Sequence, residues 1–157
     1  MSLPARKFRK IPGGDEPRPY KMKIDHIGIA THGIDEAAKW WREALGVDFG
    51  ATEEVAEQKV RVAKLSLGES CIELLEPISA DSPISKFLDK RGPGIHHIAV
   101  RVDDIRAELA KMKAKGARLI DEQPRAGAGG CLVAFVHPSS TGGVLLELVQ
   151  NPDSPGK

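Results

Sequence analysis

The chain has 157 residues, 41% hydrophobic and 29% charged, which is typical of one globular domain or of two half-domains sharing a core. A net charge of +1 gives no reason to expect nucleic acid or a membrane surface as partner, because attraction to polyanions needs a marked basic excess. Cys71 and Cys131 form no CxxC pair, and no apolar run approaches the ~18 residues of a membrane span, so we expect a reduced, cytoplasmic protein.

The first half of the chain predicts one strand, one helix and three further strands. They follow an arm at residues 1–21 that is basic, rich in proline and glycine, and expected to be flexible. Apolar runs predict strands at 24–30, 47–52, 59–67 and 71–76, with a tight turn at Gly68-Glu69. A helix is expected at 34–45. Its predicted packing face consists of apolar residues at helical spacing, namely Ala37, Trp40, Trp41, Ala44 and Leu45.

The same order of elements returns in the second half. A connecting helix is predicted at 83–90, with Ser82 as its N-cap and Pro83 at the first helical position. Strands at 95–102, 117–121, 131–137 and 144–150 then accompany a helix at 104–115. The chain is therefore predicted to be α+β, with a first βαβββ module at 22–80, a connector at 81–93 and a second module at 94–151.

Two short segments of the first module are repeated in the second. Residues 24–30 (IDHIGIA) match 95–101 (IHHIAVR), and residues 72–77 (IELLEP) match 146–152 (LELVQNP). Each module thus has a strand histidine, His26 or His97, and a strand glutamate, Glu73 or Glu147. A buried carboxylate costs several kcal/mol unless it is paired or binds a metal. The matched positions therefore favour metal ligation over a solvent-facing glutamate or a core histidine.

Two imidazoles and two carboxylates suit Co, Zn, Mn, Ni or Fe(II), with positions left for water or substrate. The lack of thiolates in this set argues against a closed structural zinc site. A metal of this kind can act as a Lewis acid on a chelated substrate oxygen. His96 is expected on the opposite side of the sheet from His97, in a structural or supporting role, because successive strand side chains alternate.

Two loops of the second module are further candidates. The glycine-rich segment 127–130 could let a ligand approach the backbone or could be a plain mobile loop, and no helix follows it as a phosphate motif requires. The segment 137–143, which begins at His137, is expected to be a turn between strands rather than a catalytic loop. No local pattern indicates a Ser-His-Asp or Cys-His nucleophile.

These residues resemble the vicinal oxygen chelate superfamily and, within it, the methylmalonyl-CoA epimerase family. The resemblance spans about residues 23–151 and is carried by 24–30, 73–77, 94–99 (GIHHIA), 102–104, 135–138 and 142–148 (GGVLLEL). It implies a curved eight-stranded sheet around a divalent metal, often in a homodimer, with His26, His97 and Glu147 as ligands. The fourth ligand position, which is glutamine in some members, falls on Glu73.

The reaction implied by the resemblance is the epimerisation of (R)- and (S)-2-methylmalonyl-CoA, an acyl-CoA whose α-carbon is inverted through a metal-stabilised enolate. Inversion needs one group to remove the α-proton and another to return one on the opposite face. Some epimerases place a proton-transferring glutamate on the third strand of the first module, where this chain has Val62. Glu147 could serve as both ligand and base, which leaves the second base unidentified.

Other functions remain open from the sequence. A glyoxalase-type lyase (lactoylglutathione lyase) would use a similar metal set on a glutathione hemithioacetal. An extradiol dioxygenase needs only two histidines and one glutamate around Fe(II), which would leave Glu73 without a role. A metal-free small-molecule-binding protein of the same fold would need an aromatic-lined cleft, which the 4% aromatic content disfavours. A neighbouring acyl-CoA such as ethylmalonyl-CoA is an alternative substrate.

Overall fold

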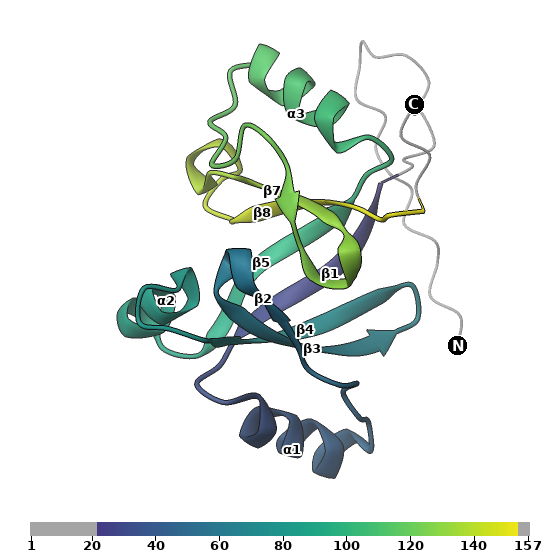
Figure 1. Ribbon diagram of the computed structural model, residues 1–157, viewed down its shortest axis with the longest axis vertical. Coiled ribbons are helices and arrows are strands. Elements are labelled where there is room, and N and C mark those ends of the chain that lie inside the picture. Colours follow the sequence, from purple (N-terminus) through teal and green to yellow (C-terminus); the bar gives the residue numbers. More distant parts are fainter. Residues whose placement is uncertain (1–21, 154–157) are drawn as a thin grey trace, which may run out of the picture.

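The computed structural model describes residues 22–153, and the order of its elements repeats as predicted (Figure 1). The first unit contains β1 (Lys23–Ala30), α1 (Ile34–Leu45), β2 (Glu53–Val55), the 3₁₀ turn η1 (Ala56–Gln58), β3 (Val60–Leu67) and β4 (Ser70–Pro77). Helix α2 (Pro83–Arg91) leads to the second unit. That unit contains β5 (Gly94–Arg101), α3 (Ile105–Ala114), β6 (Arg125–Ala126), η2 (Ala128–Gly130), β7 (Leu132–Val136), η3 (Pro138–Ser140) and β8 (Leu146–Gln150). The predicted flexible arm at 1–21 lies outside the described residues.

The eight strands form one sheet in the order β2-β3-β4-β1-β5-β8-β7-β6. At its centre β1 runs antiparallel to β5, while β4 runs parallel to β1 and β8 runs parallel to β5. This order relates the two units by a pseudo-twofold axis between β1 and β5, with α1 and α3 at opposite ends of the molecule (Figure 1). The predicted architecture, two tandem βαβββ modules in a curved eight-stranded sheet, is confirmed.

The two edges of the sheet approach one another, so that the curved sheet is nearly closed. The backbone N–H of Ala126 in β6 donates to Glu57 Oε2 at 3.1 Å, and the N–H of Gly129 donates to the carboxylate of Glu53 at 3.0 Å. The glycine-rich segment thus fastens the second unit to the first. Closure also occupies edge groups that would otherwise be free to pair with another chain.

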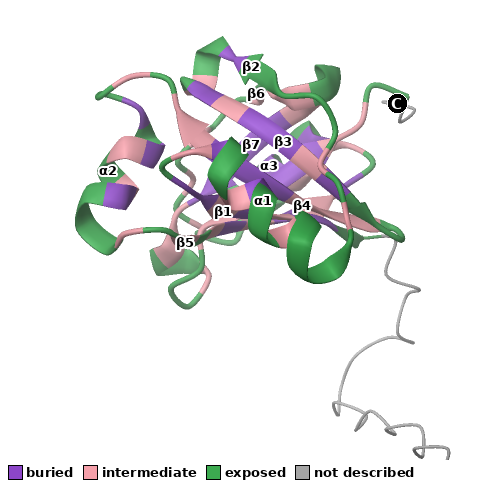
Figure 2. Cartoon of the chain, turned by 90° about the horizontal axis from the view of Figure 1, so that it is seen from below, coloured by how far each residue is buried: buried purple, intermediate pink, exposed green. Residues whose placement is uncertain are grey.

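Helices α1 and α3 cover the outside of the sheet, and the strands are the most buried elements (Figure 2). Helix α1 buries Ile34 and Ala38 against Leu74, and α3 buries Ile105 and Leu109 against the second unit. Because α1 and α3 pack on the convex side, the concave side is left for the residues described below. Helix α2 covers one end of the concave side, where its Ile84 and Leu88 pack with Leu75 of β4. No helix in residues 22–153 is long and apolar enough to cross a membrane.

The packing face predicted for α1 is only partly correct, because Ala37 packs against the core but Trp40, Ala44 and Leu45 are exposed. Trp40 is 60% exposed and Leu45 is 59% exposed, whereas Ile34 and Ala38 are buried. Adjacent helix residues lie about 100° apart, so two neighbouring tryptophans cannot both face the sheet. Trp41 instead packs edge-on against Phe49, with ring centroids 6.1 Å apart.

Two predicted strands also differ from the structure. Residues 47–52 form no strand, and pairing with β3 begins at Glu53. Residues 117–121 make only one bridge, between Leu119 and Val136, and the short strand β6 lies further along the chain. Phe49 packs against the core under α1, and Leu119 packs against the core under α3. These contacts explain why both segments are apolar although neither forms a strand. The predicted N-cap is confirmed, since Ser82 Oγ accepts from the Ile84 N–H at 3.2 Å.

Candidate metal centre and adjoining cavity

The four residues predicted from the repeat meet on the concave face of the sheet. The two histidines come from the central strands β1 and β5, and Glu73 and Glu147 come from the flanking strands β4 and β8. Each residue is at most 5% exposed. Together with Asp25 they are five of the seven buried polar or charged residues in the described part of the chain. Such a concentration of buried ionisable groups needs compensating partners.

The side chains converge on a common point. His26 Nε2 and His97 Nε2 face one another at 2.9 Å. Glu147 Oε2 lies 3.1 Å from His26 Nε2 and 2.7 Å from His97 Nε2. The potential ligand atoms of these three residues all lie within 4.8 Å of one another, and Glu73 Oε2 lies 3.2 Å from His26 Nε2. Two histidines and Glu147 can therefore serve one ion, while ligation by Glu73 stays a prediction.

The surroundings of both imidazoles fit a metal centre. His26 Nδ1 lies 2.7 Å from Asp25 Oδ1, and His97 Nδ1 lies 2.9 Å from His96 Nδ1. Metal-ligating histidines usually have their second ring nitrogen held by a carboxylate, a carbonyl or water, which fixes the ring and its tautomer. Asp25 is such a partner for His26, and His96 holds the corresponding nitrogen of His97. Each histidine thus directs Nε2 toward the common point. Imidazole nitrogens with carboxylate oxygens are the donor set of a divalent transition metal.

Asp25 is a functional candidate that the sequence reasoning missed. Strand alternation would place it on the face opposite His26, yet it is only 8% exposed. The register between β1 and β5 shifts between Ile24 and His26, so alternation is broken at this point. The hydrogen bond to His26, aided by Arg101 and opposed by burial, lowers the pKa of Asp25 to about 2. An ionised Asp25 therefore holds His26 in place.

Lys64 is a second group that was missed. It lies opposite Glu73 in the pairing of β3 and β4, and its Nζ is 3.2 Å from Glu73 Oε1. Burial alone would lower the pKa of Lys64, but the negative charge of Glu73 raises it. The ammonium group therefore stays charged and offsets one of the two buried carboxylates.

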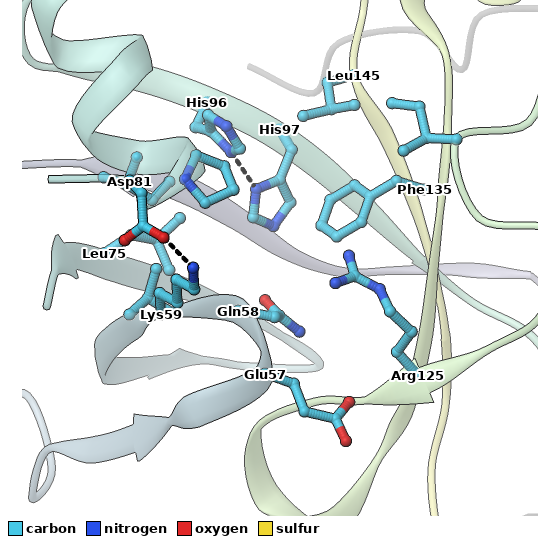
Figure 3. Close-up of a pocket in the computed structure, with 14 residues that line it drawn as sticks. Glu57, Gln58, Lys59, Leu75, Asp81, His96, His97, Arg125, Phe135 and Leu145 are labelled. Atoms are coloured by element: carbon cyan, nitrogen blue, oxygen red, sulfur yellow. Dashed lines mark hydrogen bonds and ion pairs between the residues drawn. The ribbon is translucent and has the colours of Figure 1, made fainter. Parts of the chain in front are cut away.

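A cavity of about 310 Å³ adjoins the site, and His97 lies in its wall (Figure 3). Phe135 packs edge-on against His97 with ring centroids 5.5 Å apart, and Arg125 extends into the same space. An ion pair of Lys59 with Asp81 lies on the opposite wall. A smaller cavity of about 30 Å³ is bordered by all four predicted site residues. The larger space can hold a substrate chain, and the smaller one is large enough for a water molecule or an ion.

Both candidate loops of the second module make contacts that hold the fold together. Ala128 of the glycine-rich segment borders the small cavity, and Gly129 makes the closing contact with Glu53. His137 Nδ1 accepts a hydrogen bond from the Ser139 N–H at 3.0 Å, which caps the turn η3. The prediction of a turn at His137 is confirmed.

Gly28→Ala is expected to displace His97 and impair the site. Gly28 is paired with His97 across β1 and β5, and a Cβ at position 28 would overlap His97 Cε1. Because the two backbones are fixed by the central ladder, the imidazole has to move. We expect at least ~10-fold weaker metal binding, measured by titration calorimetry, as for loss of a group that orients a ligand. Gly94→Ala is the matched control in β5, since a Cβ there meets no atom within 4 Å. Equal metal affinity in both variants would contradict the role of Gly28.

Chelator-treated protein is expected to lose stability as the pH rises above 6.5. Burial alone would lower the pKa of His26, but hydrogen bonds to Asp25 and Glu147 and the charge of Glu73 raise it to about 9. A raised pKa means that the folded state binds the proton more tightly than the unfolded state. The stabilisation is thus complete below pH 6.5 and is lost as the pH rises through about 9.

Glu147 determines how the stability of the chelator-treated protein changes at low pH. Burial would raise its pKa, but hydrogen bonds to His26 and His97 outweigh burial and lower it to about 2. Its contribution is present above pH 4.5 and is lost as the pH falls through about 2. Thermal unfolding with excess chelator should show the highest Tm between pH 4.5 and pH 6.5, and the Tm should fall as the pH rises toward 9. A Tm that stays constant between pH 6.5 and about 9 would contradict the role assigned to His26. A His26→Gln variant whose Tm falls as much as that of the wild type would contradict it as well.

Comparisons with known proteins identify the family of the chain. A family model of the Glyoxalase/Bleomycin resistance protein/Dioxygenase superfamily matches residues 25–135. The uncharacterized protein YqjC of Bacillus subtilis is 43% identical over 128 residues, which cover 82% of this chain and 91% of that protein. An ethylmalonyl-CoA/methylmalonyl-CoA epimerase of Cereibacter sphaeroides is 38% identical over 130 residues, covering 82% and 97% of the two chains. A solved structure of methylmalonyl-CoA epimerase in complex with methylmalonyl-CoA and NH4+ matches with a TM-score of 0.81 and 39% identity, covering 87% and 99%. The chain therefore belongs to this superfamily, as a member of its methylmalonyl-CoA epimerase family.

Proposed function

We propose that the protein is a metal-dependent epimerase that interconverts (R)- and (S)-2-methylmalonyl-CoA. The observation that carries the proposal is the convergence of His26, His97, Glu73 and Glu147 in a buried cluster beside the 310 Å³ cavity. The family relationship supports the acyl-CoA substrate, since a similar protein has been solved in complex with methylmalonyl-CoA.

The two glutamates are the proposed proton carriers. They come from equivalent strands, β4 and β8, on opposite sides of the central pair. We propose that they approach the α-carbon from its two faces, since inversion needs a proton carrier on each face. One carboxylate accepts the α-proton as the C–H bond breaks and its electron pair becomes the enolate. A proton must then reach the opposite face of the same carbon, and the Lys64 ammonium, 3.2 Å from Glu73 Oε1, is the neighbouring donor that can supply it through the Glu73 carboxylate. The low pKa of Glu147 favours the ionised form that accepts a proton.

His26, His97 and Glu147 would hold the metal, with Glu73 as the predicted fourth ligand. When bound, a divalent metal supplies Lewis-acid stabilisation of the charge that develops on the thioester oxygen. A second carboxylate donor lowers the net positive charge of the centre, and Lys64 offsets that effect through its contact with Glu73 Oε1. Co, Zn, Mn and Ni all suit this donor set. A homodimer and a cytoplasmic location are further proposals that the family resemblance supports.

Turnover of separate substrates tests the proposed function. Metal-reconstituted protein should convert (S)- to (R)-methylmalonyl-CoA, followed by chiral separation of the hydrolysed acyl groups. Ethylmalonyl-CoA in parallel shows whether the cavity accepts one more methylene. The glutathione hemithioacetal of methylglyoxal should not be consumed. Consumption of the hemithioacetal without epimerisation would favour the lyase instead.

A further inference from the structure

A third cavity, here called the α2 groove, opens between helix α2 and the loop that precedes β8. It has a volume of about 440 Å³. The residues that it shares with the 310 Å³ cavity are Pro83, His96, His97 and Leu145, so the two spaces meet beside the candidate metal centre. A ligand long enough to occupy both would extend from the groove to His97.

The charged lining of the α2 groove is entirely cationic. Lys86, Lys90 and Arg91 of α2 line it, and no aspartate or glutamate does. All three cations are exposed, and none forms an ion pair within residues 22–153. In the neighbouring cavity, by contrast, Lys59 and Arg125 are paired with aspartates. Three unpaired cations on one wall favour a ligand with several negative charges.

The remaining lining is apolar and accessible. Ile95 is 64% exposed and Val144 is 41% exposed, and both face the groove. The Arg91 guanidinium lies over the ring of Phe87, 5.8 Å from its centroid. Apolar surface beside cations can bind a nucleotide, with the base on the apolar side chains and the phosphates on the ammonium and guanidinium groups.

We propose that the α2 groove binds the phosphorylated adenosine end of the acyl-CoA, an inference that rests on the proposed function. The phosphates contact Lys86, Lys90 and Arg91, and the adenine lies against Ile95 and Val144. The pantetheine arm then passes beside His96 into the 310 Å³ cavity, which places the thioester at the metal centre. The groove therefore sets affinity for CoA and takes no part in proton transfer.

Reversing the charge of two groove residues separates a role in CoA affinity from a role in proton transfer. In K90E/R91E we expect the KM for methylmalonyl-CoA to rise by about 10-fold or more, with kcat within about twofold of wild type. The KM for methylmalonyl-pantetheine, which lacks the nucleotide, should stay unchanged. The matched control R106E/K115E makes the same charge change at exposed residues of α3 and its C-terminus and should leave both KM values unchanged. An unchanged KM for the CoA ester in K90E/R91E, or an equal rise for both substrates, would overturn the proposal.

Binding of free coenzyme A gives a result that does not depend on turnover. Calorimetry with wild type, K90E/R91E and R106E/K115E should show at least ~10-fold weaker binding only in the first variant, and circular dichroism checks that it is folded. Equal affinity in all three proteins would overturn the proposed groove, even where epimerisation is intact. Selective loss of affinity in a protein that turns over neither ester would support the groove and refute the epimerase.

Discussion

Replacing His97 with alanine is expected to abolish epimerisation and to weaken metal binding by more than ~100-fold. His97 Nε2 lies 2.9 Å from His26 Nε2 and 2.7 Å from Glu147 Oε2, so its removal takes away a donor at the centre of the cluster. Loss of a group that merely orients a ligand already costs about 10–100-fold in metal affinity. Metal content after dialysis and the rate of epimerisation measure the two effects.

His96→Ala is the matched control for this prediction. His96 is next in sequence and contacts the same imidazole, but through Nδ1 and from the side where Phe87 packs. Burial, with a smaller effect from His97, lowers the pKa of His96 to about 4, so it is neutral at physiological pH. We expect His96→Ala to weaken metal binding by about 10–100-fold and to keep measurable activity. A His97→Ala protein that binds metal as tightly as His96→Ala would contradict the role of His97 as a ligand.

Glu147→Gln and Glu73→Gln are each expected to slow inversion by about 10²–10⁴-fold. Glutamine keeps an oxygen donor near the metal but cannot carry the proton. If the two carboxylates serve opposite faces, each variant retains one base. Each should therefore still exchange the α-proton of one stereoisomer with solvent, and the two variants should prefer opposite stereoisomers. Rates of inversion and of deuterium exchange, measured separately for (R)- and (S)-methylmalonyl-CoA, show this pattern.

Glu76→Gln controls for loss of a glutamate from β4. The Glu76 carboxylate accepts from the Ile34 N–H at 2.8 Å and lies 3.4 Å from Arg61 Nη1, away from the metal centre. We expect near-wild-type inversion, because glutamine can still accept the bond from Ile34. Inversion at the wild-type rate in Glu73→Gln would exclude Glu73 as the second base, and the same result in Glu147→Gln would exclude Glu147.

The predicted site came from the internal repeat rather than from any single motif. One histidine and one glutamate recur at matching strand positions, and the pseudo-twofold sheet brings the two copies together. The turn at Gly68-Glu69 could also have revealed Lys64. A two-residue turn pairs Leu67 with Ser70 and therefore places Lys64 opposite Glu73, as the structure shows.

Other features could not be derived from local patterns. Asp25 points inward because of a register shift between β1 and β5, and such a shift depends on how the two strands pair. The face of α1 could not be assigned because apolar residues surround much of the helix, and tertiary packing selected Ile34 and Ala38. Residues 117–121 contribute Leu119 to the core, and a hydrophobic pattern does not distinguish that contact from a strand.

The most direct test is exchange of the substrate α-proton in D₂O. Metal-reconstituted protein is incubated with (R)- or (S)-methylmalonyl-CoA, and α-deuterium and configuration are followed by NMR. We predict deuterium incorporation with inversion that is lost on chelation, returns when metal is restored, and is absent in His97→Ala. Metal-loaded protein that neither exchanges nor inverts the α-carbon would contradict the assignment as an epimerase.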